Sequence, residues 1–238
     1  MKILLMTNYP LVDNKKWKKD LISSLCDNYE VFVLFGKKSI WSHLQAYLRR
    51  KYNTDIKKRY YRGTTEDNIR TVSFLKYNGI KYFKTSNVNS DKAIEIINRI
   101  KPDFGIVALD QILSKRVIEI VPLVLNAHFG NLPCIKGWNA TEWSMLVDRR
   151  VDVCLHKVDY KVDNGPIYLK ESINVERGDD FEDLRFKCQE LALALYIKFF
   201  ANPEYFIENS IPNKGGKTYY LINNKLKEIA QDVLKKYA

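Results

Sequence analysis

Residues 101–129 decide the fold class, with the sequence KPDFGIVALDQILSKRVIEIVPLVLNAHF. Two short apolar runs in it, 104–109 and 124–129, are bounded by polar or turn residues and predict buried strands. Between them, residues 114–122 predict a short helix that ends at Pro122. A strand, a helix and a second strand, with no hairpin turn between them, indicate a parallel α/β sheet.

The same alternation continues on both sides of this stretch. Further strands are predicted at 2–7, 31–35, 78–85, 151–158 and 166–175, the last two in antiparallel arrangement. Further helices are predicted at 16–26, at 90–102 with Ser90 as N-cap, and at 181–201 with Asp179 or Asp180 as N-cap. Residues 39–78 are weakly periodic and are expected to cross the surface, although Ile40 to Leu48 could form a helix. The expected fold is α/β, a Rossmann-like, mostly parallel sheet flanked by helices.

The chain length favours one main domain at 1–202 and a short C-terminal extension at 203–238, because 238 residues bury one good core. Hydrophobic residues at 46% and charged residues at 28% are typical of a soluble globular domain. The opening MKILLMTNYP is too short for a signal peptide, and no run approaches the roughly 18 apolar residues of a membrane span. We therefore expect a cytoplasmic protein with no membrane partner.

Composition also limits the chemistry. The four cysteines lie far apart without metal-ligand spacing, so we expect packed, reduced thiols and no metal. Neither GxGxxG, GxxxxGK[ST] nor GxSxG occurs, which argues against a dinucleotide site, a phosphate loop and a serine elbow. The net charge of +11, concentrated at 15–19 and 49–62, favours an anionic partner but does not choose among nucleic acid, phosphorylated metabolites and acidic membranes. A solvated basic surface explains it equally well.

Three polar residues stand where chemistry is expected. Asn126 and His128 end a buried strand on one face, and Asp163 sits in the turn VDNGPI before a later strand. An amide and a protonated imidazole can stabilise the oxyanion that forms when an amine attacks a carbonyl, and a carboxylate can hold the imidazole and accept the amine's proton. Each residue also has a structural interpretation, as a packed histidine, a turn-forming aspartate or a capping asparagine.

The segment resembles the formyltransferase family that uses N10-formyltetrahydrofolate. The motif of that family is Asn-x-His, then Leu-Pro and a Gly, then Asp-x-Gly-x-Ile. Here the matching residues are Asn126, His128, Leu132, Pro133, Gly137, Asp163, Gly165 and Ile167. The block KPDFGIVALDQILSKRVI at 101–118 is similar to the family's block before the catalytic strand. The resemblance implies a folate-dependent enzyme with a pterin pocket at Asp110, Gln111, Ile112, Leu113, Val158 and Asp159, and no metal.

Members of the family formylate glycinamide ribonucleotide, methionyl-tRNA or amino sugars on nucleotides. The segment TNYPLVDNKKW lacks the glycines of the ribonucleotide enzymes' phosphate loop, and residues 203–238 are too few for the second domain of the tRNA enzymes. The resemblance therefore favours a sugar N-formyltransferase for surface polysaccharide, such as the O-antigen of lipopolysaccharide, and implies a homodimer. Both other acceptors stay open. So does a non-enzymatic module that binds nucleic acid through 49–62, where Tyr52, Tyr60 and Tyr61 lie among basic residues.

Four further residues are candidates for binding the nucleotide-linked amino sugar. Asn131, Trp138 and Asn139 follow the catalytic strand closely, and the two amides and the indole suit hydroxyl groups and a deoxysugar ring. Lys81 lies near a strand end and could meet the diphosphate. The alternative for Trp138 is a packed core residue.

Overall fold

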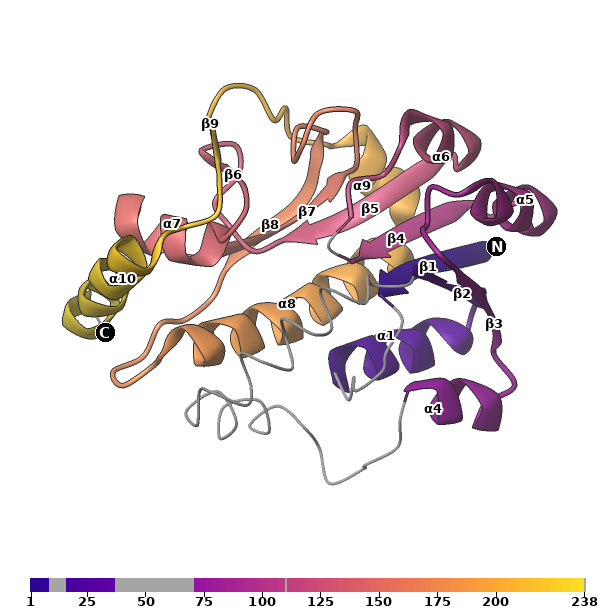
Figure 1. Cartoon of the computed structure of the whole chain (residues 1–238), viewed down its shortest axis with the longest axis horizontal. Coiled ribbons are helices and arrows are strands. Elements are labelled where there is room, and N and C mark those ends of the chain that lie inside the picture. Colours follow the sequence, from indigo (N-terminus) through magenta and orange to yellow (C-terminus); the bar gives the residue numbers. More distant parts are fainter. Residues whose placement is uncertain (9–15, 37–70, 110, 238) are drawn as a thin grey trace. The chain divides into compact units, whose positions relative to one another are not determined.

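A computed structural model describes residues 1–8, 16–36, 71–109 and 111–237 (Figure 1). The chain divides into two units, Met1–Val124 and Leu125–Ala238. The basic patch predicted at 49–62 and the helix suggested from Ile40 to Leu48 lie outside the described residues.

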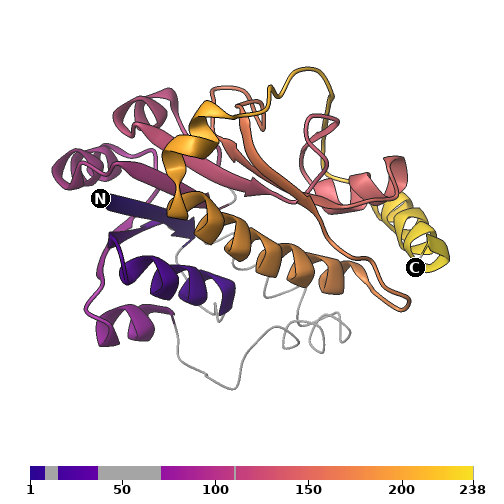
Figure 2. The ribbon, with the colours of Figure 1, turned by 180° about the vertical axis from the view of Figure 1, so that it is seen from behind.

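The first unit carries four parallel strands in the order β3-β2-β1-β4. They are β1 (Lys2–Asn8), β2 (Glu30–Gly36), β3 (Lys81–Thr85) and β4 (Phe104–Ala108). Helices α1 (Lys16–Cys26) and α4 (Thr71–Tyr77) lie on one side of these strands, and α5 (Asp91–Ile100) and α6 (Lys115–Ile120) lie on the other (Figures 1 and 2). Because both faces are covered, a continuous apolar run is buried in β1, from Ile3 to Met6. The predicted α/β class is confirmed.

Local signals explain the ends of α5. The Ser90 side chain accepts a hydrogen bond from the N–H of Ala93, which confirms the predicted N-cap. At the other end, Lys101 adopts a left-handed conformation with φ of 51° and donates its N–H to Ile97 O. Pro102 follows directly and has no N–H with which to continue the helix.

Two predictions for the first unit need correction. Residues 71–77 form helix α4 although no regular element was expected there, because only Thr71 and Leu75 of this helix are buried and the periodic signal is correspondingly weak. Strand β3 begins at Lys81 and not at residue 78, because Gly79 turns the chain with φ of 66° and Ile80 N–H closes the turn on Leu75 O.

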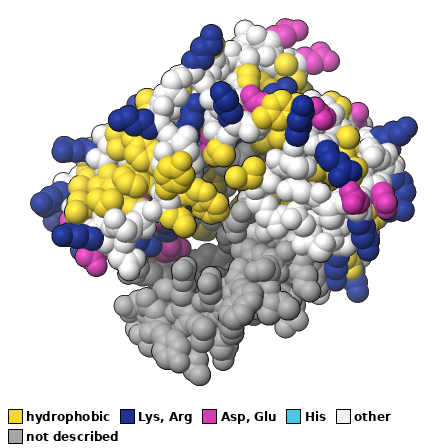
Figure 3. Space-filling model, turned by 45° about the horizontal axis from the view of Figure 1, so that its top comes forward, with side chains coloured by type: hydrophobic (Ala, Val, Ile, Leu, Met, Phe, Trp, Pro, Cys, Tyr) yellow, Lys and Arg dark blue, Asp and Glu magenta, His cyan; other side chains and the backbone are white. Residues whose placement is uncertain are grey.

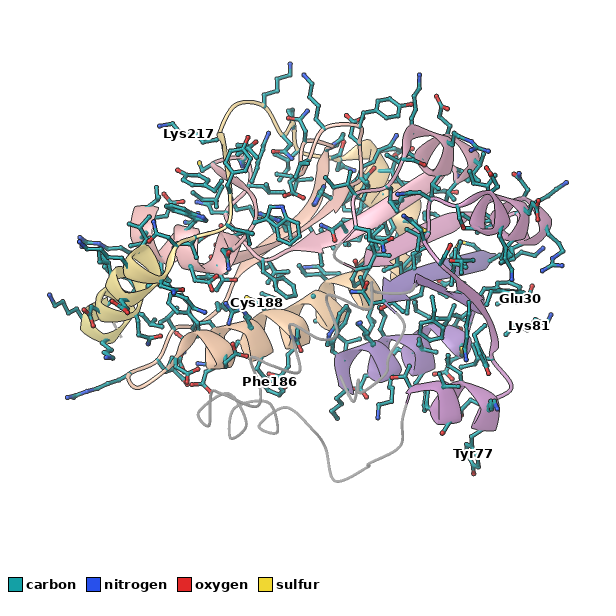
Figure 4. All side chains as sticks on the ribbon, viewed as in Figure 1. Glu30, Tyr77, Lys81, Phe186, Cys188 and Lys217 are labelled. Atoms are coloured by element: carbon teal, nitrogen blue, oxygen red, sulfur yellow. The ribbon has the colours of Figure 1, made fainter. Side chains whose placement is uncertain are left out.

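The second unit carries three strands in the order β5-β7-β8, namely β5 (Leu123–His128), β7 (Asp152–Lys157) and β8 (Ile167–Ser172). The pairs β5–β7 and β7–β8 are antiparallel, which confirms the prediction for the two later strands. Helix α8 (Phe181–Ala201) packs against β7 and β8. Its Cys188 side chain is buried, whereas Phe186 points away into solvent (Figure 4). Asp180 caps α8 and forms a capping box with Asp183, as one of the two predicted caps.

A smaller layer of the second unit surrounds the end of β5. Strand β6 (Ile135–Gly137) pairs in parallel with β9 (Lys217–Tyr219), and helix α7 (Ala140–Val147) packs against α10 (Asn224–Tyr237). Helix α9 (Pro203–Glu208) contacts α8 and β8. The extension carries α9, β9 and α10, and the short elements β6, α7 and α9 were not predicted from the sequence. The boundary expected at 202 falls between α8 and α9, inside the second unit.

The structure shows the state of the cysteines and the lengths of the helices. All four cysteines are free; Cys154 and Cys188 are buried, whereas Cys26 and Cys134 are exposed. Burial raises the pKa of Cys154 and of Cys188 to about 12, so both stay protonated near neutral pH. Within the described ranges, no helix combines the length and the apolar character that crossing a membrane requires.

Candidate active site

Strand β5 ends with two polar residues on one face of the sheet. Asn126 and His128 are two positions apart, and alternate residues of a strand share a face. Across the antiparallel pair, Asn126 lies opposite His156 of β7, and Asn126 Nδ2 is 3.3 Å from His156 Nε2. The rings of His128 and His156 meet edge to face, with centroids 6.3 Å apart. One amide and two imidazoles therefore gather at this strand end.

Asp163 reaches the same place from the turn between β7 and β8. Its Oδ2 is 3.3 Å from His128 Nδ1 and accepts the backbone N–H of Gly137 at 2.8 Å. Its Oδ1 is 3.6 Å from His156 Nε2, and the side chain is only 13% exposed. The structure thus brings Asn126, His128 and Asp163 together.

The glycine two residues after Asp163 is a steric requirement of this turn. A Cβ on Gly165 would lie 2.2 Å from the carbonyl oxygen of Lys157, the last residue of β7. No side chain fits there, so the turn can return to β8 only through glycine. The Asp-x-Gly spacing is therefore set by how closely the turn approaches the preceding strand.

Both ring nitrogens of His128 face hydrogen-bond acceptors. Nε2 lies 2.9 Å from the carbonyl oxygen of Ile135, and Nδ1 faces the carboxylate of Asp163. Only a ring protonated at both nitrogens donates to both partners, and the adjacent carboxylate stabilises that positive charge. Both N–H groups of a doubly protonated His128 would therefore have partners inside the protein.

The sequence predicts that His156 lies in a strand, but it indicates no role for this residue. Burial lowers its pKa to about 4, with the charge of His128 acting in the same direction and the carboxylate of Asp163 opposing. The ring is therefore neutral near pH 7. Its Nδ1 lies 2.7 Å from Lys157 O and donates there, which leaves Nε2 to accept the N–H of Asn126. His156 thereby orients the amide of Asn126, a role that the position of His156 seven residues before Asp163 does not by itself reveal.

A cavity of about 270 Å³ opens beside Asn126 and His128. Its wall carries a buried ion pair between Glu142, which is 1% exposed, and Arg185 of α8. Asn139 also lines the cavity and donates to the Glu142 carboxylate at 3.3 Å. The cavity is thus polar and charged along one side.

The structure corrects one candidate for substrate binding. Asn131 is 7% exposed, and its amide is fully engaged, donating to Asp148 at 2.7 Å and accepting from the ammonium of Lys170. It is a structural residue, because both ends of its amide already have partners inside the protein.

Asn139 lies in the wall of the cavity, whereas the side chain of Trp138 is exposed. The Asn139 side chain lines the cavity but also ties α7 to the C-terminal segment, since its Oδ1 accepts the N–H of Ile222 at 3.2 Å. Trp138 stands between the cavity-lining residues Gly137 and Asn139, with its side chain 45% exposed. The exposure rules out the alternative of a packed core tryptophan.

Lys81 is not placed at the binding edge of its strands. It starts β3, at the amino edge of the four parallel strands, and pairs with Glu30 at the start of β2, 3.5 Å away (Figure 4). Ligands of open α/β sheets bind at the opposite, carboxyl edge. We therefore withdraw Lys81 as a contact of the diphosphate.

The residues expected to hold the pterin lie in both units. In the first, Gln111 accepts the N–H of Val88 at 3.5 Å, and the carbonyl of Ile112 accepts from Asn89 at 2.9 Å. Leu113 is buried, the Ile112 side chain is 67% exposed, and Asp110 lies outside the described residues. In the second, Val158 and Asp159 are half-buried in the loop after β7. The segment 111–113 is thus fixed to 88–89 and presents an apolar side chain to solvent.

Comparison with known proteins identifies the family. Residues 44–200, about two thirds of the chain, match the family described as formyl transferase. The chain belongs to the formyl transferase family. Among curated relatives, the methionyl-tRNA formyltransferase of Rickettsia felis is 33% identical to this chain over 146 residues, a match that covers 59% of this chain and 47% of the relative. The chain spans about half the length of the curated relatives it matches.

Solved structures resemble the chain over most of its length. The phosphoribosylglycinamide formyltransferase of Bacillus halodurans superposes with a TM-score of 0.62 at 17% identity, covering 86% of this chain and 97% of the other. The N-formyltransferase of Helicobacter canadensis, in complex with folinic acid and dTDP-3-aminofucose, gives 0.60 at 16% identity, covering 99% and 80%. At these identities the likeness is one of fold.

Proposed function

We propose that this formyltransferase moves the formyl group of N10-formyltetrahydrofolate to the amine of a nucleotide-linked aminodeoxy sugar. The observation that carries the chemistry is the cluster of Asn126, His128 and Asp163 beside a polar cavity. The cluster has donors for a developing oxyanion and a carboxylate for a proton, and it needs no covalent nucleophile.

Each residue of the cluster has a separate task. The amide nitrogen of Asn126 has two N–H groups, so pairing with His156 leaves one for the carbonyl oxygen of the formyl group. The charged His128 stabilises the negative charge that develops on that oxygen. Asp163 holds His128 in its charged form and, directly or through water, accepts the proton that the attacking amine sheds.

The folate enters as the second substrate and supplies an electrophilic formyl carbon. The N–H of Asn126 that His156 leaves free fits a carbonyl oxygen, which supports this assignment. We propose that the loop at Val158 and Asp159 contributes to holding the pterin, because it follows directly on the strand that carries His156. Folinic acid in the related Helicobacter structure supports a folate as the donor.

Two observations support an amino sugar as the acceptor. The fold likeness to the Helicobacter enzyme, which was solved with dTDP-3-aminofucose, covers 99% of this chain and so extends through the C-terminal extension. Trp138 also has a 45% exposed indole suited to packing on a deoxysugar, and its two neighbours in sequence, Gly137 and Asn139, line the cavity. The competing acceptor is methionyl-tRNA, favoured by the 33% identity to the Rickettsia enzyme.

The proposed setting is the cytoplasm, where the enzyme acts as a homodimer in surface-polysaccharide synthesis. Four unpaired cysteines suit a reducing compartment. Light scattering at several protein concentrations tests the dimer.

The acceptor is tested by measuring tetrahydrofolate release from N10-formyltetrahydrofolate with three kinds of amine. These are a panel of dTDP-linked 3-amino and 4-amino deoxysugars, glycinamide ribonucleotide, and methionyl-tRNA. We expect the highest kcat/KM with a sugar nucleotide, and the His128→Ala variant gives the background. A higher kcat/KM with methionyl-tRNA or the ribonucleotide would overturn the choice of acceptor while leaving formyl transfer intact.

Trp138 gives a sharper test of the sugar site. Replacing Trp138 by alanine should raise the KM for the sugar nucleotide about tenfold, because about 1.4 kcal/mol of ring contact is lost. The affinity for folinic acid and the melting temperature should change little, since the side chain is 45% exposed. Tyr220→Ala, at 78% exposure in the neighbouring β9 segment, is the control and should leave the KM unaltered. A stable Trp138 variant with the wild-type KM removes this residue from the site.

A further inference from the structure

The backbone of Asp163 is held in an unfavourable conformation. Its φ is 47°, in the left-handed region that residues with a Cβ seldom adopt. Such a conformation persists only when surrounding contacts enforce it, and it clusters at sites where geometry matters. The contacts that enforce it here therefore help to determine where the carboxylate of Asp163 points.

One side chain from the C-terminal extension holds this turn on both sides. Nδ2 of Asn213 donates to the carbonyl oxygen of Asp163 at 2.9 Å and to that of Gly165, also at 2.9 Å. Asn213 is 5% exposed and lies fifty residues along the chain from Asp163. It therefore connects the extension to the candidate catalytic turn.

The chemistry of the amide fits this task. An amide nitrogen has two N–H groups in a fixed plane, and Asn213 uses both on two carbonyls of one turn. Rotating the amide by half a turn would set Oδ1 against two carbonyl oxygens, so the orientation is determined. Oδ1 itself is buried without a hydrogen-bond partner in the described part of the chain. Burying an unpaired oxygen opposes folding, so the residue is better explained by what Nδ2 does than by stability.

Neighbouring contacts fix Asn213 and complete the enclosure. Ile211 pairs with Ile167 at the start of β8 through two backbone hydrogen bonds of 2.9 and 2.7 Å. From the other side, Lys136 of β6 donates to the side chain of Asn164 at 2.8 Å. Strand β6 thus holds the side chains of the turn, since Gly137 binds the carboxylate of Asp163, while Asn213 holds its backbone.

We propose that Asn213 is a positioning residue for formyl transfer, acting through the backbone of Asp163 to aim its carboxylate at His128. The C-terminal extension is then part of the catalytic apparatus. This inference rests on the proposed role of Asp163, but not on which amine accepts the formyl group.

The test compares Asn213→Ala and Asn213→Asp with wild type, using the acceptor that wild type turns over best. The aspartate keeps the shape of the side chain but cannot donate to the carbonyls when ionised. We expect kcat to fall about 10-fold to 100-fold in both variants, since small misplacements of a catalytic group cost that much. The KM for the acceptor and the dissociation constant of folinic acid should stay within about twofold, because Asn213 is 5% exposed and is not among the residues that line the cavity. A merely structural role would not separate kcat from binding.

Two further variants make the outcome decisive. Asn209→Ala removes an exposed asparagine of the same extension and should keep the wild-type kcat. Asp163→Asn tests the underlying assignment. If Asp163→Asn is inactive and both Asn213 variants keep the wild-type kcat, the positioning role is wrong and the proposed function stands. If Asp163→Asn is active, the proposed catalytic role of Asp163 is wrong, and the positioning role of Asn213, which rests on it, is wrong as well. If the Asn213 variants regain kcat on cooling, in proportion to the fraction of protein that refolds, the loss comes from unfolding. That result would also overturn the positioning role.

Discussion

At the residue scale, the candidate site is a chain of oriented groups. His156 orients Asn126, Asp163 faces His128, and Gly137 holds Asp163. Each partner is largely withdrawn from solvent, which strengthens electrostatic effects between them. Changes of single atoms in these site residues should therefore have large effects on turnover and small effects on folding.

The first prediction concerns His128 and Asp163. His128→Ala or Asp163→Asn should lower kcat by about 100-fold to 10,000-fold, because both groups act on the transition state. Asp163→Asn keeps an oxygen that can accept the N–H of Gly137, so the melting temperature should stay close to wild type. Steady-state kinetics and thermal unfolding of the same preparations check both statements. Near-normal kcat in both variants would remove the catalytic assignment.

The second prediction follows from the lowered pKa of His156. The unfolded histidine titrates near 6.5 and the folded one near 4, so between these values the unfolded state binds more protons. The free energy of unfolding should therefore be at its full value above about pH 6.5 and fall as pH decreases toward about 4, by on the order of 3 kcal/mol from this residue.

Urea unfolding of wild type and His156→Gln across this range measures that contribution. Glutamine can accept from Asn126 but does not titrate, so the variant should lose less stability on acidification than wild type does. Parallel curves for the two proteins would contradict a neutral, buried His156.

At the element scale, the short strands β6 and β9 help to hold the candidate site in place. Gly137 of β6 binds Asp163, and β9 keeps β6 in place through a three-residue parallel pair. The segment before β9 runs so close to the backbone at Pro133 that a Cβ on Gly216 would lie 1.6 Å from the carbonyl oxygen of Pro133. The connection before β9 therefore depends on glycine.

The third prediction compares two adjacent glycines. Gly215 and Gly216 both have positive φ, 80° and 76°, but a Cβ on Gly215 would meet nothing within 4 Å. Gly215→Ala should cost only the conformational strain of about 1 kcal/mol. Gly216→Ala should cost more and should also lower kcat, because it pushes β9 away from the segment before β6. Chemical unfolding and kinetics of both variants measure this difference, and equal effects would show that the close approach has no role.

At the scale of the whole molecule, the protein is strongly basic, with a net charge of +11. Lys and Arg side chains are spread widely over the face in Figure 3, and acidic side chains are fewer there. Such a field attracts anionic ligands at long range and is screened by salt.

The fourth prediction tests this field. Raising NaCl from about 50 mM to about 0.5 M should raise the KM for a sugar nucleotide by about threefold to tenfold, because the Debye length falls well below the size of the protein. The value of kcat should stay constant, since the buried site is screened much less. An uncharged osmolyte at matched osmolality is the control. A KM that does not respond to salt would indicate that the excess charge is only a solvated surface.

The sequence by itself determined the elements and the principal candidate residues. Burial leaves a periodic trace along the chain, so β1, α1, α5, β4, β5 and α8 were predictable from apolar spacing and caps. Asn126, His128 and Asp163 were recognisable because residue type, strand-end position and motif agree. Helix α4 and strand β6 were not, since they bury too few residues to leave such a trace.

The tertiary structure decided which polar groups serve substrate and which serve the fold. The sequence offers Asn131, Asn139 and Asn213 as similar amides, yet Asn131 is fully engaged inside the protein and Asn213 clamps the turn of Asp163. His156 acquires its role only from strand pairing, which sets it opposite Asn126 thirty residues away. The physical reason is that hydrogen-bond partners across such separations depend on packing and register, whereas local periodicity records only whether a residue is buried.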